Sequence, residues 1–206
     1  TRAAEGAWDG AWYRRGYYDD GRPLGSEACG ECRIDAIAQA FAALDTHADR
    51  GRVHTALTSA VEQLFDREHN VVRLFDPPIT RRTPETGYVR SYGAGLRENG
   101  GQYTHGALWL AMALLRTGRT AEGVEILHAV LPAAHDPARY EGEPYVLAAD
   151  IAGGDNAGVA GWTWYTGAAG WYLRIAAEDL LGLHLRGGVL YPEPHLPAGW
   201  PECTVR

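Results

Sequence analysis

Residues 103–132, YTHGALWLAMALLRTGRTAEGVEILHAVLP, decide the fold class of this chain. Apolar residues recur three and four positions apart along 103–117, and Gly118 stands where a helix C-cap is expected. We expect Thr120 to cap a second helix, which Pro132 ends. The members of the two apolar stripes are Ala107, Leu108, Ala111, Leu114 and Leu115, then Val124, Leu127 and Leu131. The segment therefore predicts two helices joined as a hairpin.

The same period continues on both sides of this segment. Residues 31–44 and 49–65 each carry an apolar stripe at helical spacing, which predicts an earlier helical hairpin, and residues 168–181 predict a last helix ended by Gly182. Residues 183–191 change to a period of two around Gly187-Gly188, which is typical of a β-hairpin. The predicted fold is mainly α, a partial toroid of helical hairpins with a short C-terminal β-hairpin.

Composition excludes several classes of function. The chain has 206 residues, 46% of them hydrophobic, with a net charge of -7. An acidic surface argues against nucleic acid as a partner, and the sequence shows neither a membrane span nor a signal peptide. Three cysteines cannot all pair, which favours a reducing cytoplasm. We interpret Cys29-Gly30-Glu31-Cys32 as structural, because a zinc site needs two further ligands.

Three loop segments concentrate aromatic, charged and glycine residues. In residues 12–21, aromatic rings beside carboxylates and guanidinium groups suit a sugar, whose apolar face stacks on rings while its hydroxyls bind charged groups. A β-hairpin with an Asp20-Gly21 turn explains this segment equally simply, and from the segment alone we favour that hairpin.

The other two loops each lead into a predicted helix. In residues 92–105, Gly100-Gly101 permits close approach of backbone to a ligand, and His105 is either a phosphate ligand or a packed histidine. In residues 161–171, Thr166 and Gly167 offer a hydroxyl and a backbone N–H to an oxyanion, although Thr166 also suits a helix N-cap. Spacing leaves both pairs of alternatives open.

Several longer motifs, taken together, resemble a known family. They are Trp12 to Gly25, Cys32 to Gln39, Arg97 to His105, Glu143 to Val146, and Trp162 to Gly167. In this order they resemble the glycoside phosphorylases that include cellobiose phosphorylase, chitobiose phosphorylase and the C-terminal domain of cyclic β-1,2-glucan synthase. Residues 102–105 and 148–150 are most similar to the glucan synthase branch.

The resemblance implies an (α/α)6 barrel, with residues 1–182 as the C-terminal portion of its catalytic domain and 183–206 as the start of a small β-rich segment. It implies phosphorolysis with inversion at the anomeric carbon, which yields α-glucose 1-phosphate. Phosphate would be bound by His105, Thr166 and Gly167. The acceptor sugar would be bound or shaped by Tyr92, Arg97 and Glu98.

The family's general acid lies in an Asp-Trp-Asn-Asp type motif that this sequence lacks. We expect that acid upstream of Thr1, so that the chain is a fragment with no catalytic residue of its own. Ala149 stands where cellobiose phosphorylases have a sugar-binding Gln, which is more compatible with β-1,2-glucan than with cellobiose as substrate.

The expected partners are a β-glucan oligosaccharide and inorganic phosphate as co-substrate, with no metal and no other cofactor. We expect a cytoplasmic protein, and the resemblance is compatible with a homodimer and with a parent chain on the cytoplasmic side of the inner membrane. Two alternatives stay open: a non-catalytic carbohydrate-binding or structural module, and a glycoside hydrolase on the same barrel, which would use water and two carboxylates.

Overall fold

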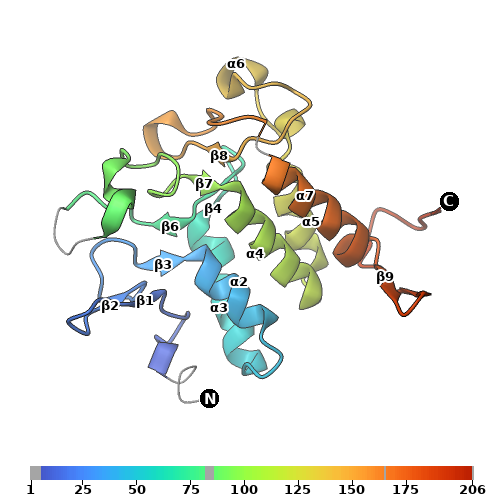
Figure 1. Cartoon of the computed structure of the whole chain (residues 1–206), viewed down its shortest axis with the longest axis horizontal. Helices are drawn as coiled ribbons and strands as arrows, with labels where there is room; N and C mark the ends of the chain where they lie inside the picture. The colour runs from blue at the N-terminus through green and yellow to red at the C-terminus, as the bar shows by residue number, and fades with distance from the viewer. Residues whose placement is uncertain (1–5, 82–85, 165, 206) are drawn as a thin grey trace.

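Helices form most of the regular structure in the computed structural model, which describes residues 6–81, 86–164 and 166–205 (Figure 1). The α-helices are α2 (Ala36–Leu44), α3 (Arg50–Leu64), α4 (Thr104–Arg116), α5 (Thr120–Ala129), α6 (Pro137–Tyr140) and α7 (Thr166–Arg174). The 3-10 helices are η1 (Gly87–Ser91), η2 (Pro132–Ala134) and η3 (Gly154–Asn156), and α7 continues as a π-helix, η4 (Ile175–Leu180).

Helix α4 lies at the centre and packs against α2, α5 and α7 (Figure 1). The predicted apolar stripe of α4 was too narrow. Ten residues of the helix are buried, including Leu110, Met112 and Ala113 from outside the stripe. A helix that neighbours cover on several sides buries most of its circumference. Helix α5 comes especially close, because a Cβ added at Gly123 would lie 2.9 Å from Cγ of Leu115.

The predicted helical hairpins are confirmed as α2–α3 and α4–α5. Three helix starts differ from expectation, and one is that of α7, which begins at Thr166 instead of residue 168. Helix α2 begins at Ala36 rather than near residue 31, because Asp35 caps it by accepting from the backbone N–H of Ala38 at 3.1 Å. Thr120 is the first residue of α5 and not its cap, since Arg119 occupies the N-cap position.

Short antiparallel strand pairs connect the helices. They are β1 (Gly16–Tyr17) with β2 (Pro23–Leu24), β3 (Ile34–Asp35) with β6 (Phe75–Asp76), β4 (Phe65–Asp66) with β5 (Val71–Val72), β7 (Gln102–Tyr103) with β8 (Asp150–Ile151), and β9 (Leu183–Arg186) with β10 (Val189–Pro192). The first and last pairs confirm the two predicted β-hairpins. At the tip of the last hairpin, Gly187 and Gly188 have φ values of 59° and 81°, which glycine adopts without strain.

A partly buried ion pair joins the C-terminal part of the chain to the central helix. Asp179 of η4 is 2% exposed, and its carboxylate accepts a hydrogen bond from Nε of Arg116, the last residue of α4, at 2.5 Å.

Within the described residues, no helix is long and apolar enough to cross a membrane. The arrangement is that of a partial (α/α)6 barrel with a short C-terminal β-hairpin, as predicted.

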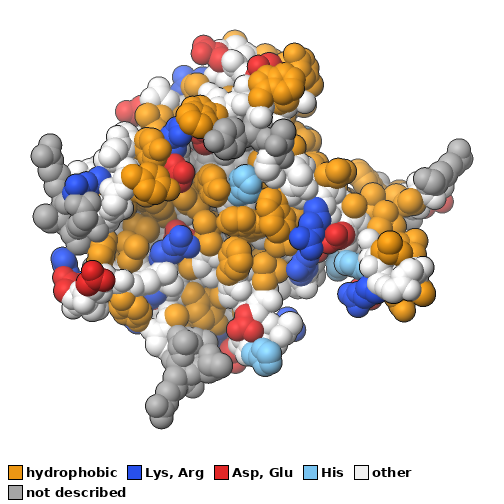
Figure 2. Space-filling view, in the orientation of Figure 1, with side chains coloured by type: hydrophobic (Ala, Val, Ile, Leu, Met, Phe, Trp, Pro, Cys, Tyr) orange, Lys and Arg blue, Asp and Glu red, His pale blue; other side chains and the backbone are white. Residues whose placement is uncertain are grey.

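The space-filling view shows which face of this partial barrel is apolar. Hydrophobic side chains cover the middle of the face drawn in Figure 2, over the region where Figure 1 places α2, α4 and α7. Between these three helices, the ring of Trp109 of α4 contacts Phe41 of α2 and Trp171 of α7, with centroids 5.4 Å and 5.8 Å apart. These rings lie next to the first turn of α4, where the candidate site begins.

The side chain of Gln39 links the N-terminal segment to helix α2 by hydrogen bonds. This side chain is completely buried, accepts from the backbone N–H of Tyr13 at 2.7 Å, and donates to the carbonyls of Tyr13 and Asp35 at 2.8 and 2.9 Å. We expect Gln39→Leu to lower the free energy of unfolding by about 3 kcal/mol, because it leaves two buried backbone groups of Tyr13 unsatisfied. Urea denaturation measures the loss.

The control for this prediction is Gln63→Leu, at a half-buried glutamine of α3. A substitution away from such a network should change the free energy of unfolding by less than about 0.5 kcal/mol. Equal losses in the two variants would contradict the role given to Gln39.

Candidate functional site

Three segments far apart in the sequence lie side by side at the N-terminal end of α4. In the β7–β8 pair, Tyr103 is opposite Asp150. The next residue, Thr104, donates its backbone N–H to the carbonyl of Ala149 at 3.0 Å, and Ala149 in turn donates to the carbonyl of Trp162 at 2.6 Å. The predicted loops 92–105 and 161–171 are therefore brought together through residues 149–151.

His105 occupies the first turn of α4, inside a group of aromatic rings. It stacks on Tyr103 with centroids 5.2 Å apart and 22° between the planes, and Trp109 is 5.8 Å away. Burial lowers the pKa of the imidazole below its ordinary value of 6.5, so the neutral form is favoured in the unliganded chain. Its Nδ1 is buried and has no hydrogen-bond partner among the described residues.

The start of helix α7 approaches the same imidazole. A Cβ added at Gly167 would lie 2.9 Å from Nε2 of His105, so the histidine ring lies directly against the glycine. Thr166 is the first residue of α7, and its side chain lies outside the described part of the chain, as does Tyr165. The structure thus brings together two of the three residues predicted to bind phosphate, and places the third at the adjoining helix start, where backbone N–H groups favour an anion.

Of the residues predicted to bind the acceptor sugar, Arg97 and Tyr92 lie together. The guanidinium of Arg97 is 3.9 Å from the ring centre of Trp162 and 5.4 Å from that of Tyr92, so it contacts both rings. Arg97 has a φ of 48°, in the left-handed region that few non-glycine residues adopt. Because this backbone conformation is costly for a residue other than glycine, the surrounding structure must hold Arg97 in it.

Glu98 points to a different place from its neighbour. It lines a cavity of about 430 Å³ together with Tyr103, Asp35 and Arg15. One of its oxygens, Oε2, is buried and has no hydrogen-bond partner among the described residues. A buried acceptor without a donor is costly, so a ligand hydroxyl or water is expected to supply one.

The glycines of loop 92–105 have another role than predicted. A Cβ at Gly100 would lie 2.7 Å from Cγ of Pro78, and one at Gly101 would lie 2.7 Å from the carbonyl oxygen of Gly95. These glycines therefore permit close approach between parts of the chain itself, rather than to a ligand. Asn99, fully buried, holds the loop by bonding to the backbone of Ile79 and to the carbonyl of Tyr92 at 2.8 Å.

Sequence reasoning missed Asp35 and Arg15 as site residues. Asp35 is 3% exposed, caps α2, and has an oxygen 3.7 Å from Nε of Arg15. Burial raises the pKa of this carboxyl. Within residues 12–21, the combination of carboxylates, arginines and aromatic rings was a signal that could have indicated Arg15. The pairing of Arg15 with Asp35 depends on the fold.

The two cysteines of the CxxC motif are free thiols. Burial raises the pKa of Cys32, which keeps the thiol protonated at neutral pH and argues against a redox role. Cys29 donates to the carbonyl of Pro23 at 3.2 Å. Within residues 6–81, 86–164 and 166–205, no group of three or more His, Cys, Asp and Glu side chains is arranged to hold a metal ion.

Comparison with known proteins gives consistent matches across almost the whole chain. Residues 2–182 match the family model described as the glycosyl hydrolase 94 superfamily, catalytic domain. The chain is 46% identical to the cyclic beta-(1,2)-glucan synthase NdvB of Rhizobium meliloti (strain 1021) over 98% of its length, which covers 7% of that protein.

Two phosphorylases are also similar. Identity is 30% to the solabiose phosphorylase of Paenibacillus borealis, over 97% of this chain and 26% of the relative, and 27% to the N,N'-diacetylchitobiose phosphorylase of Vibrio proteolyticus, over 96% and 25%. The chain thus spans about a quarter of these phosphorylases, and a much smaller share of the synthase. It belongs to the glycosyl hydrolase 94 superfamily, as a portion of that family's catalytic domain.

Proposed function

We propose that this chain supplies the phosphate-binding and acceptor-binding parts of an inverting phosphorylase that acts on β-glucan. Among β-glucans, we propose the β-1,2-linked glucan as the substrate. The observation that carries this proposal is the contact between His105 of α4 and Gly167 of α7. Two segments about 60 residues apart in the sequence meet there, and both offer groups that bind an oxyanion.

The chemistry requires phosphate to attack the anomeric carbon while the glycosidic bond breaks on the opposite face. The leaving oxygen takes a proton from a carboxylic acid, which on this proposal comes from another part of the full-length protein. His105 and the start of α7 would hold and orient the phosphate, and Arg97 and Glu98 would contact different sides of the acceptor sugar that departs. Holding the phosphate and the sugar next to one another would replace their random encounter in solution by an oriented approach of the reacting atoms.

Two observations favour β-1,2-glucan among the candidate substrates. The relative named as a cyclic beta-(1,2)-glucan synthase is 46% identical, against 30% for the solabiose phosphorylase. Ala149, which bonds through its backbone to Thr104 and Trp162, carries a methyl group at a position where a sugar-binding amide is implied for cellobiose phosphorylases. Such a methyl group cannot make the hydrogen bonds of that amide.

The first test is formation of glucose 1-phosphate from β-1,2-gluco-oligosaccharides and phosphate by the full-length gene product. We expect phosphate-dependent release, and we expect His105→Gln to raise the KM for phosphate by about 10- to 100-fold, because it removes a charge-assisted hydrogen bond. The matched control is His128→Gln, at an exposed histidine in the last turn of α5, which should leave this KM unchanged.

Other outcomes of this assay distinguish the alternatives. Release of glucose that does not depend on phosphate would indicate a hydrolase. Binding of glucan without any product from the full-length protein would indicate a non-catalytic carbohydrate-binding module.

A second prediction uses the contact at the start of α7. Gly167→Ala should force the imidazole of His105 aside, because the new Cβ would lie 2.9 Å from Nε2, and phosphate affinity should fall by at least about tenfold. The control is Gly170→Ala in the same helix, where nothing lies within 4 Å of an added Cβ. Calorimetric titration with phosphate compares the two variants, and equal affinities would exclude a role for the contact.

A third prediction concerns pH. Burial lowers the pKa of His105 in the unliganded chain, whereas a neighbouring phosphate favours the imidazolium and raises it. Binding of phosphate should therefore take up a proton, and the affinity should weaken as pH rises through the pKa of the bound state. His105→Gln keeps the titration of phosphate itself, so the difference between the two pH profiles isolates the histidine. Identical profiles would contradict its role.

A further inference from the structure

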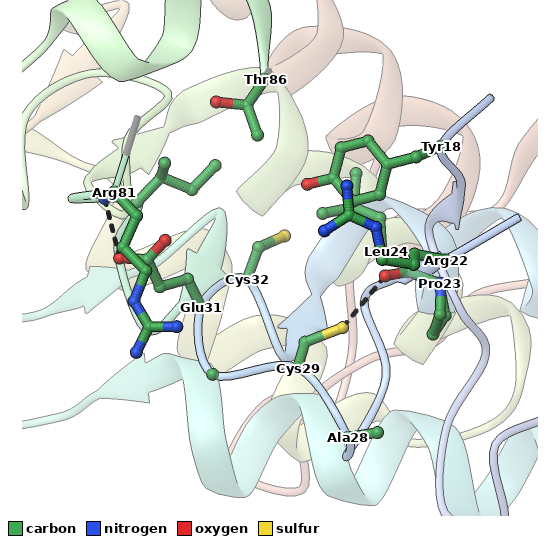
Figure 3. A pocket seen from close by; sticks show the side chains of 12 residues that line it. Tyr18, Arg22, Pro23, Leu24, Ala28, Cys29, Glu31, Cys32, Arg81 and Thr86 are labelled. Carbon is green, nitrogen blue, oxygen red and sulfur yellow. Dashed lines mark hydrogen bonds between the residues drawn. The ribbon is translucent and has the colours of Figure 1, made fainter. Parts of the chain in front are cut away.

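Two cavities adjoin on the side of the site that holds Glu98. The inner cavity is the one of about 430 Å³ already described, and the outer cavity has about 320 Å³ (Figure 3). The residues that line both are Tyr18, Leu24, Cys32, Ile79 and Thr86. The two cavities are therefore neighbours, and we call them together the groove; each has the size typical of small-molecule sites, about 300–1,000 Å³.

The inner end of the groove meets the predicted acceptor site. Glu98 contributes its unpartnered buried oxygen there, and Asp35 lies beneath Arg15. The backbone of Arg15 lies tightly against Gly25 of the same hairpin, since a Cβ added at Gly25 would lie 2.6 Å from the backbone N of Arg15. The inner cavity therefore combines a hydrogen-bond donor, Arg15, with the carboxyl acceptors of Asp35 and Glu98.

The outer end has a similar chemical character. Figure 3 shows Tyr18 and Arg22 on one side of the cavity, with Glu31 and Arg81 on the other. The guanidinium of Arg22 is 5.6 Å from the ring centre of Tyr18. Oγ1 of Thr86 is buried and has no hydrogen-bond partner among the described residues. The outer cavity thus combines an aromatic ring with polar groups, one of them unsatisfied.

The charges along the groove balance. Its described lining residues include the guanidinium groups of residues 15, 22 and 81 and the carboxyl groups of residues 31, 35 and 98, three of each kind. A site for an anion would show an excess of cations. Donors and acceptors in equal measure beside the rings of Tyr18 and Tyr88 match a neutral ligand that has many hydroxyl groups and an apolar face.

We propose that this groove binds the glucose units of a β-glucan chain that lie beyond the acceptor sugar. The inference rests on the proposed function, which places the acceptor sugar beside Glu98. It adds Tyr18, Arg22 and Arg15 as residues that select chains longer than a disaccharide. The next sugar would lie in the inner cavity, and a further one against Tyr18 in the outer cavity.

Calorimetric titration of the full-length gene product with β-1,2-gluco-oligosaccharides, from the disaccharide to the pentasaccharide, tests this proposal without phosphate. We expect affinity to rise with length in the wild type. Tyr18→Ala should weaken pentasaccharide binding about tenfold and leave disaccharide binding nearly unchanged. The matched control is Tyr17→Ala in the same hairpin, because that tyrosine's hydroxyl bonds to the carbonyl of Gly6 and to Arg14, and Tyr17 does not line the groove.

A second variant guards against loss of folding. Arg22 is largely exposed, so Arg22→Ala should leave the thermal unfolding temperature unchanged and should weaken pentasaccharide binding selectively. The proposal would be overturned if the affinity of the wild type did not depend on glucan length. It would also be overturned if both variants lost equal affinity for short and long glucans. A protein that binds long glucans preferentially but forms no glucose 1-phosphate would support the groove and refute the phosphorylase activity.

Discussion

Burial of α4 on several sides is the constraint on which the rest of the structure depends. Because α2, α5 and α7 all pack on this helix, even the first turn is buried at Thr104 and Gly106. The backbone of that turn has no room to move, since close packing resists displacement. His105 is therefore held in one place by the core, and the stacked ring of Tyr103 limits its rotation. On the proposed function, a histidine held in this way would stabilise a bound anion without first having to reorient.

The short strands extend this constraint to the loops. Pairing of residues 102–103 with 150–151, followed by the bonds from Thr104 to Ala149 and from Ala149 to Trp162, fixes the two loops against one another. The space is tight, because a Cβ at Gly161 would lie 2.0 Å from Oδ2 of Asp150. Trp162 is consequently placed over Arg97, and the aromatic and charged residues of separate loops form one surface.

The helical hairpins could be predicted from sequence because periodicity and helix ends are local properties. The start of α2 could not, because residues 31–34 continue the apolar period of the helix, while β3 pairs with a strand some forty residues later. Gly100 and Gly101 were recognised as positions of close approach, but what approaches them is decided by Pro78 and Gly95. The contact of His105 with Gly167 was expected only from the family resemblance, since spacing alone left the histidine open. The groove beside Glu98 is assembled from four separate segments, and no sequence pattern indicates such an assembly.

The two halves of the proposed site differ in electrostatic design, and this difference suits the two substrates. At the start of α7 the helix dipole and a half-buried His105 would meet the anion; burial lowers the pKa of this histidine, and an adjacent anion would favour its charged form. Along the groove, equal numbers of basic and acidic side chains would leave the potential nearly neutral, so on the proposal a glucan would be held by directional hydrogen bonds and ring stacking. An anion would then gain little in the groove, and a neutral sugar would gain little beside the helix terminus. On the proposed function, this division directs phosphate to the anomeric carbon and keeps the rest of the glucan chain away from the phosphate pocket.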